Sequence, residues 1–138
     1  MSKYQELVNF YGQKRDEEQN QKDKLHKNLN ELKDVFSRYL ECNPNMIEIT
    51  SVYFLNNQYT AKLKIHLISK NLHTEEKTDE EISLSINGEY LTKQTLIIEN
   101  LPDFETEFEN NLDKISQLFF GAVHTKYVPK PEFLHTTI

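Results

Sequence analysis

The chain contains little cysteine, glycine or proline and no tryptophan: one cysteine, three glycines and four prolines in 138 residues. The single thiol, Cys42, can form neither an intramolecular disulfide nor a thiolate metal site. Three isolated glycines do not make a phosphate-binding loop. The five histidines never have the i,i+4 spacing of a helical zinc pair. We therefore predict no metal, no cofactor and no nucleotide site.

Long hydrophobic runs are also missing. No apolar run approaches the roughly 18 residues of a membrane span, and no secretory segment follows Met1. These features predict no membrane partner and, with only one cysteine, a cytoplasmic location. Cys42 itself is typical of a structural thiol, because nothing near it in sequence supplies a base.

The net charge of -6 is concentrated in the last third of the chain. Six acidic residues precede the first following base, Lys114: Glu99, Asp103, Glu105, Glu107, Glu109 and Asp113. This run is typical of acidic residues at a helix start, where they interact favourably with the helix dipole. A surface for a basic partner and a nucleic-acid mimic are alternatives. Direct nucleic-acid binding is disfavoured, because no basic stripe offers phosphate neutralisation.

Residues 1–43 read as one long helix, because apolar and polar residues recur at the alternating steps of four and three that form a coiled-coil seam. Residues 12–24 contain no apolar side chain, so the apolar character lies at the two ends. The half from Leu25 to Leu40 is expected to pack on its own domain. We predict that the other end is a partner interface formed by Leu7, Val8, Phe10 and Tyr11. A break at Gly12, with the first segment folded back, is the alternative.

Residues 45–99 are predicted to form a four-stranded antiparallel meander. Residues 46–55 and 59–69 are rich in β-branched and aromatic side chains and are separated by asparagines, which indicates a hairpin. Residues 71–81 are polar and predict a charged loop. A third strand at residues 82–86 meets Asn87-Gly88, a typical hairpin turn, with a loop that points Tyr90, Leu96 and Ile98 inward.

Residues 103–124 are predicted to form a core helix with Asp103 as its N-cap, followed by an extended tail at residues 125–138 with two prolines. The chain is thus expected to be a single domain, residues 1–138, of the α+β class, with helices on one sheet face. The small acidic chain and this helix–sheet–helix order are similar to bacterial secretion chaperones. That resemblance implies binding of an extended segment of another protein.

Three functions remain open at this stage. The favoured one is a non-enzymatic protein-binding or assembly module, chaperone-, inhibitor- or accessory-subunit-like, that forms a homodimer or docks through its first helix. The alternative is a small-molecule binding or sequestering protein that uses the sheet face or an oligomer interface. An enzyme is the third, and Glu48 is its candidate residue because its strand neighbours, Ile47 and Ile49, could turn it toward a concave face.

Overall fold

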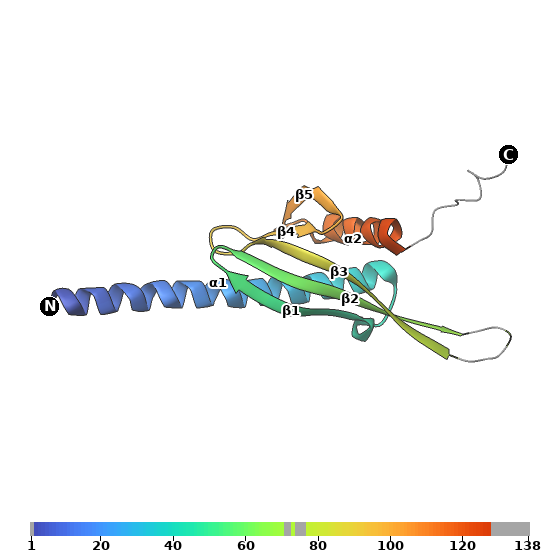
Figure 1. Cartoon of the computed structure of the whole chain (residues 1–138), viewed down its shortest axis with the longest axis horizontal. Coiled ribbons are helices and arrows are strands. Elements are labelled where there is room, and N and C mark those ends of the chain that lie inside the picture. Colours follow the sequence, from blue (N-terminus) through green and yellow to red (C-terminus); the bar gives the residue numbers. More distant parts are fainter. Residues whose placement is uncertain (1, 71–72, 74–76, 128–138) are drawn as a thin grey trace.

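The computed structural model describes residues 2–70, 73 and 77–127 and shows an α+β fold with two helices on one face of an antiparallel sheet (Figure 1). The elements in chain order are α1 (Lys3–Leu40), the 3-10 turn η1 (Pro44–Met46), β1 (Ile47–Leu55), β2 (Gln58–Lys70), β3 (Lys77–Glu89), β4 (Thr95–Ile98), β5 (Leu101–Glu107) and α2 (Leu112–Tyr127). The sheet order is β1-β2-β3-β4-β5. The predicted class is confirmed, with five strands instead of four.

Helix α1 is continuous from Lys3 to Leu40 and does not break at Gly12. The side chain of Ser2 caps its start by accepting a hydrogen bond from the backbone N–H of Gln5 at 3.1 Å. Its C-cap residue, Glu41, has the left-handed conformation that commonly ends a helix. The fold-back alternative is therefore wrong.

The hydrophobic core lies between α1, α2 and the inner face of the sheet. Alternate residues of β2 point into it: Tyr59, Ala61, Leu63 and Ile65 are buried, whereas Leu67, the next in the alternating series, is 43% exposed. On α1 the buried side chains are Leu25, Leu29, Leu32 and Phe36, which confirms that this half packs on its own domain. The rings of Phe36 and Phe119 meet edge to face at 5.2 Å and join the two helices.

The β1–β2 hairpin is confirmed, and Asn56 takes the positive φ of 56° in its two-residue turn. At the opposite end, β2 and β3 extend farther than predicted. Residues 77–81 were expected in a loop but belong to β3, where Glu81 pairs with His66 and Glu80 with Leu67. The predicted loop residues 71–72 and 74–76 lie outside the described part of the chain.

The prediction of a hairpin turn at Asn87-Gly88 is wrong. Strand β3 continues through both residues to Glu89, and Asn87 pairs with Ile97 of β4. A Cβ atom on Gly88 would lie 2.0 Å from the carbonyl oxygen of Thr95, so glycine is needed here to let the two backbones approach closely. The residues predicted to point inward, Tyr90, Leu96 and Ile98, are nevertheless buried.

The predicted helix at residues 103–124 begins too early. Pro102 and Asp103 lie in β5, which pairs with β4, and α2 starts only at Leu112. Burial alternates at the end of this strand: Thr106 and, just after the strand, Phe108 are buried, while Glu105 and Glu107 are exposed. Helix α2 reaches Tyr127, so residues 125–127 are helical instead of extended. The rest of the predicted tail, residues 128–138, lies outside the described part.

Candidate functional site

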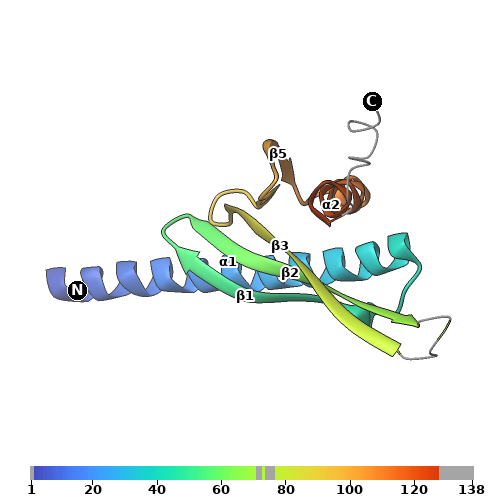
Figure 2. The same cartoon turned by 45° about the vertical axis from the view of Figure 1, so that its right-hand side comes forward.

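The first 15 residues of α1 project beyond the sheet. Figure 1 shows this end of the helix extending past the β1–β2 turn, and Figure 2 shows the same projection from a second direction. Residues 3–17 are exposed, apart from the half-buried Gly12. At 1.5 Å per residue this free segment is about 22 Å long.

The helix is anchored where it leaves the domain. The side chain of Gln94, buried in the β3–β4 loop, donates a hydrogen bond to the carbonyl oxygen of Gln21 at 2.8 Å and accepts one from the side chain of Asn28. One residue further on, the Lys22 ammonium lies 5.1 Å from the centre of the Phe54 ring. These contacts fix the direction in which the free segment points.

Local interactions hold the free segment helical without a core. Besides the Ser2 cap, the side-chain amide of Gln5 donates to the side-chain oxygen of Asn9 at 3.2 Å. Toward the domain, Gln19 and Asp23 make the same i,i+4 contact at 3.0 Å. Such pairs each stabilise a helix by a few tenths of a kcal/mol. The polar stretch therefore acts as a spacer that keeps its far end away from the domain.

The far end of this spacer carries an apolar cluster, which we call the tip patch: Tyr4, Leu7, Val8, Phe10 and Tyr11. Their exposed fractions are 75%, 58%, 46%, 60% and 63%. The Phe10 and Tyr11 rings contact each other edge to face at 5.6 Å, so the patch is locally ordered. All four residues predicted as an interface are thus exposed, and Tyr4 joins them.

The tip patch is hollowed on one side. A depression of about 590 Å³ is lined by Tyr4, Leu7, Val8, Tyr11, Gly12 and Arg15. An added Cβ on Gly12 would have nothing within 4 Å, so this glycine leaves the depression open. Sequence reasoning missed Gly12 and Arg15 as part of the surface. The signal was available, since Arg15 continues the seam of Tyr4, Val8 and Tyr11 at steps of four, three and four.

A larger groove, of about 1070 Å³, runs between α1 and the β4–β5 side of the sheet. Its lining includes charged side chains of both signs, among them Lys24, Glu31, Arg38, Lys93, Glu107 and Asp113. Lys24, Glu31 and Arg38 lie two turns apart along α1, so the groove follows the helix. Its mixed charge offers many weak polar contacts and no concentrated field of one sign.

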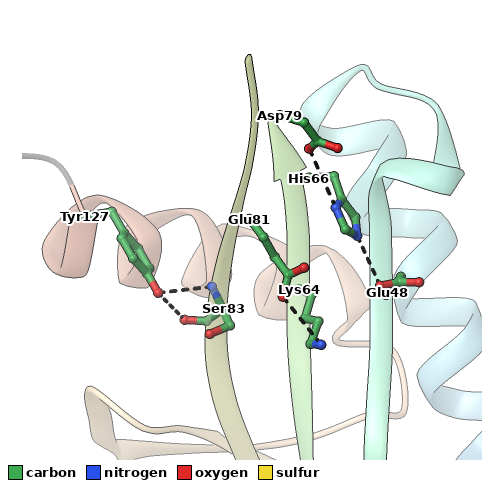
Figure 3. Close-up of polar contacts among 7 residues, drawn as sticks. All are labelled: Glu48, Lys64, His66, Asp79, Glu81, Ser83 and Tyr127. Carbon is green, nitrogen blue, oxygen red and sulfur yellow. Dashed lines mark hydrogen bonds and ion pairs between the residues drawn. The ribbon is translucent and has the colours of Figure 1, made fainter. Parts of the chain in front are cut away.

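The outer face of the sheet carries a row of ion pairs (Figure 3). The Nε2 atom of His66 lies 3.1 Å from a Glu48 oxygen, and Nδ1 lies 4.0 Å from Asp79. The hydrogen bond to Glu48 raises the pKa of His66, and the same bond lowers the pKa of Glu48. Beside them, Lys64 and Glu81 are 3.4 Å apart.

These charges lie outside both hollows described above, whose linings do not include Glu48. Glu48 is exposed on the face of the sheet opposite the core. The reason is register: Glu48 pairs with Lys64, which alternates with the inward Leu63 and Ile65. A shifted pKa at such an exposed pair reflects the ion pair itself and gives no sign of acid–base chemistry.

Cys42 is half-buried against the core, and this burial raises the pKa of its thiol. A raised pKa disfavours the reactive thiolate. Within residues 2–70, 73 and 77–127, no group of three or more His, Cys, Asp or Glu side chains is placed to hold a metal ion. Neither helix in this described part is long and apolar enough to cross a membrane.

Comparison with known proteins finds no family model, no curated protein and no solved structure that matches the chain significantly. Functional inference therefore depends on the geometry of the chain itself. The fold does not account for the exposed apolar residues of the tip patch, since they contribute nothing to the core.

Proposed function

We propose that this protein is a non-enzymatic binding module that assembles with protein through the tip patch of α1. The observation that carries this proposal is the 46–75% exposure of five large apolar side chains at the end of a projecting helix. Their removal from water by a partner would be favourable, and clustered exposed apolar residues mark interaction surfaces.

The composition of the tip patch supports a protein partner. Three of its five residues are aromatic, and Tyr and Phe are enriched at the centres of protein interfaces. They sit at helical spacing on one rigid rod, which is the way amphipathic helices present anchors to a groove or to another helix. Chaperones, inhibitors and accessory subunits could each use such a surface. A cytoplasmic location fits the half-buried Cys42, whose thiol would stay reduced there.

Small-molecule binding is the second candidate, and the groove of about 1070 Å³ favours it. Ligand sites of this size usually combine an apolar lining with a few convergent polar groups. Here charged side chains such as Lys24, Glu31 and Asp113 dominate instead. We therefore place this function second.

The proposed function is tested by affinity capture from an extract with three forms of the tagged chain. The first is the natural sequence, and the second is Leu7→Gln with Tyr11→Gln, which removes apolar surface while keeping good helix formers. The third is a matched control, Tyr53→Thr with Leu55→Thr, because these strand residues are 70% and 76% exposed. A partner, either another protein or an untagged copy, should be retained by the first and third forms and lost from the second.

The captured partner must then bind in the purified state with the same dependence on the tip. Circular dichroism should show that all three forms keep their fold, since none of the altered residues is buried. If every form captures the same proteins, or if the strand control loses the partner and the tip variant keeps it, the proposed function is wrong.

A further inference from the structure

We propose that the tip patch binds a second copy of this chain, with the two α1 tips antiparallel and a two-fold axis between Asn9 and Phe10. This inference rests on the proposed function and names its partner. Three features of the free segment carry it: the self-complementary lining of the depression, the charge at Arg15 and the length of exposed helix.

The depression maps onto itself under this two-fold axis. In an antiparallel helix pair, the axis brings Tyr4 of one copy level with Arg15 of the other, Leu7 level with Gly12, and Val8 level with Tyr11. These are the six residues that line the depression. A surface that returns to itself in this way is what a two-fold homodimer requires, because each copy presents the same patch.

The seam residues form matching layers in this arrangement. Val8 of one copy packs against Tyr11 of the other, and the axis generates this apolar layer twice. The Arg15 guanidinium lies over the Tyr4 ring of the second copy, a cation–π contact that is also made twice. A parallel arrangement would instead place the two Arg15 side chains together, which is repulsive.

The exposed length of α1 selects the same arrangement. The free segment is residues 3–17, and its centre, Phe10, lies next to the proposed axis. Two antiparallel tips therefore overlap along their whole free length. From Leu25 onward the same helix face is buried in its own core. A parallel partner following the seam would run into that core, whereas an antiparallel partner ends where the core begins.

The resulting particle is a dumb-bell whose two sheets lie at opposite ends of a helix pair. The pair is about 22 Å long, which is a small interface of the kind that binds weakly and reversibly. We therefore expect a monomer–dimer equilibrium that depends on concentration. Sedimentation velocity from about 1 to 500 µM should show a shift from 16.4 kDa to twice that mass. Arg15→Glu should weaken dimerisation at least several-fold.

Cross-linking tests the register. In a Cys42→Ser background, one preparation carries Tyr4→Cys and another carries Arg15→Cys. Each is treated with a short bis-maleimide alone and after the two are mixed. The mixed preparation should give several-fold more cross-linked dimer than either alone, because the antiparallel register brings position 4 of one copy level with position 15 of the other, whereas the two copies of position 4 lie about 16 Å apart along the helix pair. Gln13→Cys, an exposed position on the opposite side of the helix, is the matched control and should not cross-link.

Each result decides between the two proposals. A single species of 16.4 kDa at every concentration overturns the second-copy inference, while the proposed function is still judged by loss of capture in the tip variant. A dimer that cross-links best within the Tyr4→Cys preparation alone overturns the antiparallel register. A dimer that the Leu7→Gln, Tyr11→Gln variant leaves intact overturns the second-copy inference, because self-association then does not use the tip, and the proposed function is again judged by capture alone.

Discussion

Replacing Gly88 by alanine should destabilise the domain severely. The added Cβ would lie 2.0 Å from the carbonyl oxygen and 2.7 Å from the carbonyl carbon of Thr95, so β3 and β4 must move apart. Overpacking of this kind costs roughly 1–3 kcal/mol. The same carbonyl oxygen accepts a 2.7 Å hydrogen bond from the buried hydroxyl of Tyr59, and a donor left unsatisfied costs roughly 1–3 kcal/mol more.

The expected loss is therefore about 2–6 kcal/mol, a large part of the free energy of unfolding of a domain this size. Urea unfolding followed by circular dichroism measures it, with the slope compared between forms. Gly121→Ala in α2 is the matched control: its Cβ would have nothing within 4 Å, and alanine should stabilise the helix by about 0.5–1 kcal/mol. If Gly88→Ala unfolds at the same urea concentration as the natural chain, the close approach of Gly88 to Thr95 is wrong.

Three further predictions follow from the same structure. Deleting residues 1–12 should leave the urea midpoint unchanged, whereas Leu32→Ala should lower the free energy of unfolding by roughly 2–5 kcal/mol. A deletion that destabilises the domain as much as Leu32→Ala would show that the tip packs on the domain. Because Glu48 raises the pKa of His66 above 6.5, their pairing should stabilise the fold below about pH 6.5, and this stabilisation should disappear as the pH rises through the raised pKa. NMR titration should give a lower His66 pKa in Glu48→Gln. An equal pKa in the two forms would contradict the pairing. Zinc, magnesium, ATP and cyclic nucleotides should not raise the melting temperature, and a reproducible rise of several degrees with any of them would favour small-molecule binding.

The elements with long, regular patterns could be predicted from the sequence. The buried face of α1 followed from apolar residues at helical spacing, and β2 followed from strict alternation along residues 59–67. The exposure of the tip patch was also predictable, because the polar residues 12–24 separate it from the core by a length of helix that no local contact can shorten.

The wrong predictions concern residues with two physical uses. Glycine after asparagine suggests a turn, but Gly88 serves a close approach to Thr95, which lies on a strand that local pattern does not place. Phe104 and Phe108 have helical spacing, yet the residues between them form a strand. Thr106 pairs with Leu96 of β4 and Glu107 with Thr95, so tertiary pairing prevails over the local pattern. A local signal was present: Asp103, Glu105, Glu107 and Glu109 alternate along the chain, as the outer face of a strand does.

The outermost strands of the sheet bear on what kind of assembly is possible. β5 presents Pro102 and a ladder of carboxylates, and β1 is interrupted at Ser51, where φ is 55° and the register shifts. Proline, like charges and bulges all hinder another strand from adding to an edge. Growth by sheet extension is thus disfavoured on both sides, and with it the open-ended polymerisation that leads to fibres. A chain that exposes apolar surface on a helix, and whose edge strands hinder strand addition, can associate and still form particles of limited size.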